Sequence, residues 1–279
     1  MRTPSLAALL VLSLFCSGAR CAGLASVHLE ELTWTEVRDA LRSGTTTIII
    51  PVGGTEQNGP HMALGKHNVR VRVLAGRVAS ELGNALVAPV LSYVPEGSVS
   101  PPSGHMRYPG TISISDEAFK AVLDGAARSF RQHGFAHIVW LGDSGNYQTL
   151  IADVAARLNR EWAASRTATA NPARAHWIGD YYRAAQAPYV QALRDRGLSE
   201  AQIGTHAGAA DTSLLLAIDP ALVRADRMAP GYRMADDGSV AGDPRAASAA
   251  LGQIGVELIV ARSVAAIRSA VNAGKAPPR

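Results

Sequence analysis

Short apolar runs that suit buried strands alternate along the chain with longer segments of helical period. The runs are TTTIIIPV (45–52), ALVAPVL (85–91), HIVWL (137–141) and AHWIG (175–179), and helical segments follow them at 68–83, 115–134, 149–165 and 180–197. Four such units in succession predict an α/β fold with a mostly parallel sheet. A last helix is expected to end near Asn272.

Two of these helices have a residue suited to capping at their start. Asn68 and Ser115 each precede a segment of helical period, and Asn and Ser are preferred at helix N-termini. In the first helix, the apolar residues expected to face the core are Val69, Val73, Leu74, Val78 and Leu82. Residues 92–111 form a long loop rich in Pro, Gly and Ser, and residues 234–248 are expected to form a flexible excursion.

The first 22 residues resemble an export signal. One arginine precedes the apolar run LAALLVLSLF, and small residues follow it, as in bacterial secretory signals. This run is too short to span a bilayer. We therefore expect a signal peptide over residues 1–22, cleavage between Cys21 and Ala25, one domain over residues 23–279, no membrane span, and a periplasmic or secreted location. Acylation of Cys21 is the alternative, which Arg20 disfavours.

Composition excludes several classes of function. The 279-residue chain is 47% hydrophobic and 18% charged, which suits one globular domain with a large core. Without Arg2 and Arg20 the formal charge falls from +4 to about +2, and no block of Lys or Arg argues for nucleic acid. Both cysteines, Cys16 and Cys21, lie in or beside the signal. A metal in the mature protein must therefore be held by nitrogen and oxygen ligands.

Polar residues follow the strand-like runs. Glu56, Asp143 and Asp180 come after three of the runs, and the loop after a fourth carries Glu96 and His105. In an open parallel sheet, ligands bind in the crevice beyond the carboxyl ends of the strands. These side chains are therefore expected to converge on one rim.

Four segments resemble the signature motifs of the creatininase (creatinine amidohydrolase) family, in the same order. GGTEQNGPHMALGKHN (53–68) is similar to the family's Gly-Ser-x-Glu-Gln-His-Gly-x-His-Leu-Pro-Leu-x-x-Asp loop, and GHMRYPGTISIS (104–115) to its His-x-x-Phe-Pro-Gly-Thr segment. GFAHIVWLGDSGN (134–146) resembles its Gly-Phe-x-x-Ile-x-x-x-Asn-Gly-His-Gly-Gly strand and turn, and HAGAADTSLLLAI (206–218) its His-Ala-Gly-x-x-Glu-Thr-Ser segment. The resemblance implies a three-layer α/β/α sandwich, frequent assembly into hexamers, and a metal-dependent hydrolase of C–N bonds in cyclic or linear amides other than peptides.

The chain departs from these motifs at several positions where the resemblance implies metal ligands. Glu56 keeps the first ligand position. The other positions carry Asn58 for a histidine, His67 for a bridging aspartate, Ser144 for a histidine, Asn146 for a glutamate and Asp211 for a glutamate. A two-metal site copied from the family would therefore lack several ligands.

One metal ion is the cofactor that these residues predict. Glu56, His67 and Asp143 would give a set of two carboxylates and an imidazole suited to one Zn or Mn ion. Such an ion would lower the pKa of bound water and polarise an amide carbonyl. A chain without any metal is the alternative.

The remaining candidate residues are assigned by chemistry and by position in the motifs. The catalytic candidates are Glu56, His61, His206 and Asp211, and the candidates for binding a small-molecule amide are Asn58, His105, Tyr108, Ser144 and Asn146. Histidines and carboxylates suit proton transfer. For His61 the alternative is a structural role, capping the loop through hydrogen bonds.

Two other functions compete with the metal-dependent hydrolase. A non-catalytic ligand-binding protein would explain the replaced ligand positions and the export signal. A serine hydrolase would use Ser144 in GDSGN, whose positions resemble the Gly-x-Ser-x-Gly turn, with Asp180 and His206 following in the order of a triad. That alternative leaves the 53–68 loop unexplained.

Overall fold

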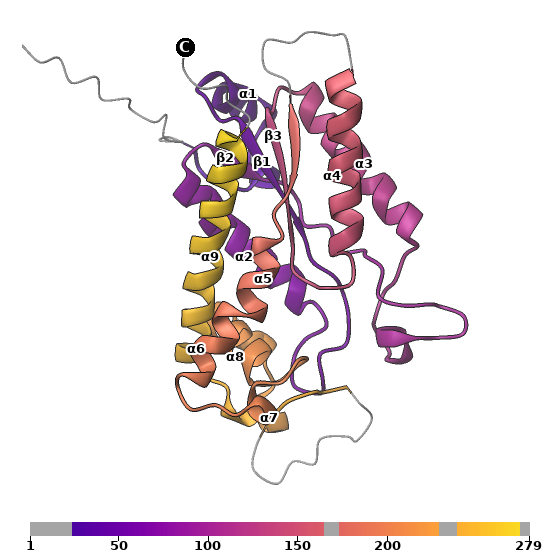
Figure 1. The fold of residues 1–279 in the computed structure, drawn as a ribbon, viewed down its shortest axis with the longest axis vertical. Helices are drawn as coiled ribbons and strands as arrows, with labels where there is room; N and C mark the ends of the chain where they lie inside the picture. The colour runs from indigo at the N-terminus through magenta and orange to yellow at the C-terminus, as the bar shows by residue number, and fades with distance from the viewer. Residues whose placement is uncertain (1–23, 165–172, 229–238, 274–279) are drawn as a thin grey trace, which may run out of the picture.

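The computed structural model describes residues 24–164, 173–228 and 239–273. The expected export signal therefore lies outside the described residues. The sheet has four parallel strands in the order β2-β1-β3-β4 (Figure 1). Their bounds are β1 Thr47–Val52, β2 Ala85–Val87, β3 His137–Gly142 and β4 Arg174–Trp177. The predicted parallel α/β sheet is confirmed.

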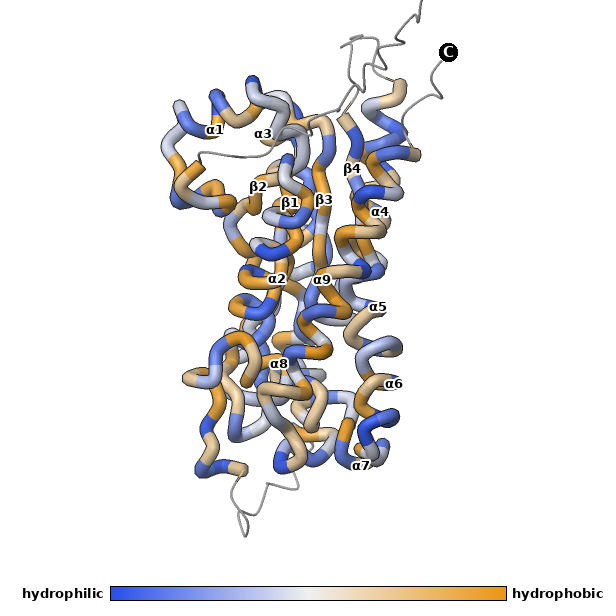
Figure 2. The backbone as a smooth tube through the Cα atoms, turned by 90° about the vertical axis from the view of Figure 1, so that its left-hand side faces the viewer, coloured by the Kyte–Doolittle hydropathy of each residue, from blue (hydrophilic) through white to orange (hydrophobic). Residues whose placement is uncertain are grey.

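Helices cover both faces of the sheet, which makes three layers (Figure 1). Alternate residues of β1 point to opposite faces, so Ile49 packs in one core cluster while Ile48 and Ile50 pack in the other. The Ile49 face carries α2 Lys66–Leu82, α5 Asp180–Gln186, α6 Pro188–Arg194, α8 Ala209–Ile218 and α9 Ala249–Asn272. The opposite face carries α3 Asp116–Gln132 and α4 Gln148–Ala164. Figure 2 shows the hydrophobic residues along the central strands β1 and β3.

Short helices occupy the connections between these elements. They are α1 Trp34–Arg42, α7 Glu200–Ile203 and the 3-10 helices η1 Leu29–Glu31, η2 Gly104–Arg107, η3 Pro220–Leu222, η4 Ala225–Met228 and η5 Pro244–Ala246. The 180–197 segment is two helices, α5 and α6, because Pro188 cannot continue the hydrogen bonding of the preceding turn. The expected end of the last helix near Asn272 is confirmed.

The sequence predicted one helix cap correctly and one wrongly. Ser115 accepts a hydrogen bond from the Ala118 backbone N at 3.2 Å, as an N-cap does. Helix α2, however, begins before Asn68, at Lys66 with Gly65 as N-cap. Asn68 instead accepts from the Gly54 backbone N at 2.9 Å. It therefore holds the loop after β1 against the helix.

The face of α2 that enters the core is also shifted from the expected one. Val71, Leu74 and Val78 are buried, whereas Val73 is 36% exposed. Val69 and Leu82 are only half-buried. The buried face of α2 also includes His67 and Arg70. At the start of the helix this face is therefore polar, and further along it is apolar.

A single tyrosine joins the ends of the two central strands. The hydroxyl of Tyr147 accepts hydrogen bonds from the backbone N of Asp143 at 3.1 Å and of Ser144 at 2.9 Å. It lies 2.9 Å from the carbonyl oxygen of Val52, the last residue of β1, and can donate to it. The turn after β3 is therefore held to the end of β1.

Helix α9 is apolar and long. By length and composition alone it could cross a membrane, but 44% of its most apolar stretch is buried inside the protein. Its buried residues include Val256, Ile259 and Val260, which belong to the core cluster on one face of the sheet. A core helix of a globular domain has these properties too.

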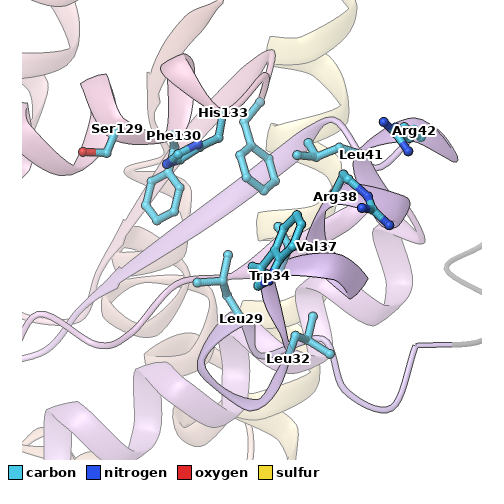
Figure 3. Close-up of a pocket in the computed structure, with 11 residues that line it drawn as sticks. Leu29, Leu32, Trp34, Val37, Arg38, Leu41, Arg42, Ser129, Phe130 and His133 are labelled. Atoms are coloured by element: carbon cyan, nitrogen blue, oxygen red, sulfur yellow. The ribbon is translucent and has the colours of Figure 1, made fainter.

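A cavity with mostly apolar walls lies at the amino ends of the strands (Figure 3). It has a volume of about 760 Å³ and is lined by apolar residues of η1, α1 and the end of α3, among them Leu29, Leu41 and Phe130. These elements precede β1 and β3 in the chain, so this cavity is at the end of the sheet opposite to the expected crevice.

Close packing of α9 on α8 predicts the effect of one substitution. A Cβ at Gly252 would lie 1.8 Å from the carbonyl oxygen of Ser213 in α8. We expect Gly252→Ala to lower the free energy of unfolding, by about 1 to 3 kcal/mol as in overpacked cores, although Ala favours helices.

The matched control is Gly125→Ala in α3, where an added Cβ meets nothing within 4 Å. It should raise stability by about 0.5 to 1 kcal/mol. Urea unfolding of both variants measures the difference, and equal effects would disprove the packing argument.

Candidate functional site

A polar cavity of about 330 Å³ lies at the carboxyl ends of the strands. Glu56 lies in the loop after β1, Asp143 follows β3, and helix α5 follows β4. The first turns of α2 supply Lys66, His67 and Arg70, which line the same cavity. The segment before α8 adds His206 to its wall.

His67 joins the first two carboxylates. Its Nε2 lies 2.8 Å from Glu56 Oε1 and its Nδ1 lies 2.6 Å from Asp143 Oδ2. Each ring nitrogen of His67 is therefore engaged by a carboxylate oxygen, one from each loop. Tyr181 donates to the other oxygen of Asp143 at 2.6 Å. The loops after β1 and β3 are thus connected by a chain of charged hydrogen bonds.

Arg70 and Lys66 extend this network to the start of α8. The Nε of Arg70 donates to Asp143 Oδ2 at 2.8 Å, and its NH1 donates to Asp211 Oδ1 at 2.9 Å. The Nζ of Lys66 lies 3.3 Å from Asp211 Oδ2. The charges of Lys66 and Arg70 outweigh the effect of burial and hold the pKa of Asp211 well below its usual range. Two buried cations, Lys66 and Arg70, therefore face two carboxylates, Asp143 and Asp211.

Glu96 is a further buried carboxyl group beside Glu56, and it is only 2% exposed. Its Oε2 accepts from Asn146 Nδ2 at 2.8 Å. Burial and the neighbouring Glu56 carboxyl raise the pKa of Glu96 to about 9. Burial would also raise the pKa of Glu56, but the charge and hydrogen bond of His67 bring it below its usual range.

Glu56, His105 and His206 have the arrangement of a metal-binding group. One ligand atom from each residue lies within 4.8 Å of the others. Glu56 Oε2 is 3.3 Å from His105 Nε2, and this buried oxygen has no hydrogen-bond partner among the described residues. Burial lowers the pKa of His206 to about 4, so it is neutral, as a ligand must be. Two imidazoles and a carboxylate suit one divalent ion.

Gln57 holds the two histidines of this group. Its Nε2 lies 3.1 Å from His105 Nδ1 and 3.1 Å from His206 Nε2. The two rings stand 4.8 Å apart between centroids. The η2 loop and the segment before α8 are therefore placed against each other by one amide next to Glu56.

Comparison with known proteins identifies the family. The family model described as creatinine amidohydrolase matches residues 30–267. The chain belongs to the creatininase family. It is 28% identical over 204 residues to "Creatinine amidohydrolase" of Pseudomonas putida, which covers 73% of this chain and 76% of that one. It is 29% identical over 240 residues to "Mycofactocin precursor peptide peptidase" of Mycolicibacterium smegmatis, covering 78% and 83%.

Solved creatininase structures have the same fold. A structure titled "Creatininase Mn" matches with a TM-score of 0.67 and 26% identity, over 88% of this chain and 98% of that one. A mutant creatininase described as "Zn-Zn type" matches with a TM-score of 0.68, 26% identity and the same coverage. These likenesses support a divalent metal in the family's fold without deciding which ion.

Most of the predicted site residues of this creatininase-family chain meet in one cavity. Its wall includes these predicted residues: Glu56, His67, His105, Asp143, Ser144, Asn146, His206 and Asp211. The predicted metal set of Glu56, His67 and Asp143 is in contact, but both ring nitrogens of His67 are engaged by the two carboxylates. That ligand assignment stays a prediction, and Glu56 with His105 and His206 is the set that the geometry favours.

Three predicted residues do not line the cavity. Asn58 is fully buried and donates to the backbone oxygen of Glu56 at 2.9 Å, so it supports the loop. His61 is fully buried, with its Nε2 3.0 Å from the Thr212 hydroxyl. This contact suits the structural role that was the alternative to catalysis. Tyr108 lies at the end of η2, away from the wall of the cavity. These three residues are therefore not part of the cavity wall, and their predicted roles stay predictions.

The triad of a serine hydrolase does not assemble. Asp180 pairs with Arg183 at 2.9 Å, and His206 Nε2 lies against Gln57. No hydrogen bond joins Ser144 to His206 within the described residues. The geometry gives no support to Ser144 as the nucleophile of such a relay.

Sequence reasoning missed Gln57, Lys66, Arg70 and Tyr181. One signal could have found two of them. Lys66 and Arg70 stand four residues apart, on either side of His67, and residues four apart share a helix face. Once the helix is known to begin at Lys66, this spacing places both cations on the face that holds His67. Gln57 also had a signal, because it matches the glutamine of the 53–68 motif beside Glu56. Tyr181 carries no comparable sequence signal.

The buried state of His61 predicts a pH dependence of stability. Burial, together with the charge of Lys66, lowers the pKa of His61 to about 4. Below about pH 6.5, His61 becomes protonated in the unfolded chain but stays neutral in the folded chain. The free energy of unfolding therefore falls as the pH falls. His61→Gln keeps a partner for Thr212 and should lose about 2 kcal/mol less between pH 7 and 5.

Urea unfolding of the wild type and of His61→Gln at both pH values measures this difference. Parallel pH dependence in the two proteins would show that His61 titrates normally in the folded state.

Proposed function

We propose that this protein is a metal-dependent amidohydrolase that cleaves an amide C–N bond of a small molecule. The observation that carries the proposal is the group of Glu56, His105 and His206, whose ligand atoms converge beside an unpartnered carboxylate oxygen. Membership of the creatininase family supports hydrolysis of an amide. The proposed cofactor is one Zn or Mn ion.

The surrounding residues are arranged to orient Glu56. His67 donates to Oε1 of Glu56, so Oε2 is the atom left for an ion. Asp143 holds His67 in turn through a short hydrogen bond, and Tyr181 donates to the other oxygen of Asp143. Partners of this kind fix the geometry of a ligand and tune its basicity. When bound, the ion would supply a Lewis acid and a water of lowered pKa.

The proposed substrate is a small amide. The cavity volume of about 330 Å³ is at the low end of the range for small-molecule sites. Polar groups at its wall, including Ser144, Asn146 and Tyr182, can hydrogen-bond a substrate's carbonyl and nitrogen groups. A peptide is the competing substrate, because one relative is named as a peptide peptidase. Hydrolysis of small cyclic and linear amides compared with short peptides separates the two.

A non-catalytic binding protein is the second candidate. The engagement of Asp143 and Asp211 by Arg70 favours it, because these carboxylates are already neutralised within the protein. Absence of bound metal after incubation with Zn and Mn would support this candidate over the hydrolase. Export to the periplasm and assembly into a homo-oligomer are further proposals, which rest on the sequence.

The metal proposal predicts an order of effects on affinity. Glu56→Gln and His105→Gln should each abolish tight Zn binding, because each removes a ligand atom. His67→Gln should weaken binding by about 10 to 100-fold, as loss of an orienting partner does. Isothermal titration calorimetry with Zn on the mature protein measures these affinities.

His133→Gln is the control, because His133 is exposed at the end of α3 and lines the other cavity. Its Zn affinity should equal that of the wild type. A larger loss in His67→Gln than in His105→Gln would favour the set of Glu56, His67 and Asp143 instead.

A further inference from the structure

The carboxylates at the cavity fall into two groups that differ in their partners. Glu56 Oε2 has no hydrogen-bond partner among the described residues. Asp143 and Asp211, in contrast, have a donor or a cation at every oxygen. Oδ1 of Asp143 accepts hydrogen bonds from Arg70 and Tyr181. Its Oδ2 accepts from Arg70 and lies within hydrogen-bond distance of His67. Among the described carboxylates that line the cavity, Glu56 is therefore the one with an oxygen left for an ion.

Asp211 is held by two side-chain cations and one backbone group. Its Oδ1 accepts from Arg70 NH1 at 2.9 Å. Its Oδ2 accepts from the backbone N of Ala207 at 3.1 Å and lies 3.3 Å from Lys66 Nζ. A divalent ion at this carboxylate would have to displace both cations, because their positive charges repel it at short range.

The two cations are fixed parts of the interior. The side chain of Lys66 is 1% exposed and that of Arg70 is 5% exposed. Buried charges of this kind persist only with partners, and the partners here are Asp143 and Asp211. Lys66 and Arg70 therefore occupy the place beside Asp143 and Asp211 where a metal ion would otherwise bind.

We propose that Lys66 and Arg70 act as built-in cations in place of a second metal ion, so that this cavity takes one divalent ion and not two. The inference rests on the proposed ion at Glu56, His105 and His206. A relative described as "Zn-Zn type" shows that the fold accepts a pair of ions in another chain. In this chain the positive charge at Asp143 and Asp211 comes from the side chains of α2.

The built-in pair also changes what the cavity offers to a ligand. Arg70 is committed to Asp143 and Asp211 through three of its nitrogen–oxygen contacts. Lys66 also lines the cavity, and its ammonium carries three donors. It gives the cavity a positive charge whose position does not depend on metal supply.

The test counts zinc ions per chain in matched variants. Wild type, Arg70→Ala and Arg72→Ala are dialysed against zinc and measured by inductively coupled plasma mass spectrometry. Arg72 is the control because it lies on the same helix but is partly exposed, with Glu30 and Glu31 as partners. We expect about one ion in the wild type and in Arg72→Ala, and about two in Arg70→Ala, where the carboxylates of Asp143 and Asp211 lose their shared cation and become able to ligate a second ion.

Thermal unfolding with and without zinc gives a second readout. Arg70→Ala should melt below the wild type without zinc, because two buried carboxylates lose their cation, and zinc should raise its Tm more than that of the wild type. Arg70→Gln keeps a donor for Asp143 and should show the same gain if the alanine variant fails to fold. Adding Asp211→Asn should remove the second ion again.

The outcomes separate this inference from the proposed function. Two ions in the wild type, or one ion in both Arg70 variants with no extra stabilisation by zinc, would overturn the built-in cations and leave the hydrolase proposal standing. No ion in the wild type would overturn the proposed function, and this inference with it.

Discussion

The ion pairs of Arg70 are the constraint on which the site depends. One guanidinium contacts Asp143 after β3 and Asp211 at the start of α8, two segments that are far apart in the chain. Removing one partner of such a buried pair typically costs about 3 to 5 kcal/mol, because the other charge is left unpaired. The arrangement of the cavity wall therefore depends on a few charges that cannot be lost singly.

These charges also conflict with the local preferences of the helix that carries them. Lys66 and Arg70 occupy the first turns of α2, where the helix dipole favours negative side chains. The conflict is resolved only by the carboxylates that other segments bring in, Asp143 and Asp211. Departures from local preferences of this kind tend to mark functional regions. In α2 the departure lies at the polar cavity beyond the carboxyl ends of the strands.

The fold could be predicted from sequence because its signals are local. Apolar runs such as HIVWL and the cap Ser115 each depend on neighbouring residues, and both were found correctly. The start of α2 was not, because Asn68 has the chemistry of a cap but uses it on the loop after β1. In the site, the convergence of Glu56 and Asp143 was expected because both residues follow the carboxyl ends of parallel strands.

The partners of those residues did not follow from the sequence. His67 and Asp143 are 76 positions apart and Arg70 and Asp211 are 141 apart, so no spacing rule connects them. His61 is a different case, since a motif position suggested chemistry and the structure places its Nε2 3.0 Å from the Thr212 hydroxyl in the interior. Pairing at long range is decided by tertiary packing, which a single sequence does not display.

The tyrosine at the end of β3 has a consequence for how this site could have diversified. Tyr147 fixes the backbone of the turn through its own hydroxyl, and burial raises the pKa of that hydroxyl well above its usual value, so it keeps its proton. The path of the main chain is thus independent of which side chains the turn displays at Ser144 and Asn146. Ligand positions in this scaffold can be exchanged one at a time during evolution while the frame that presents them stays in place.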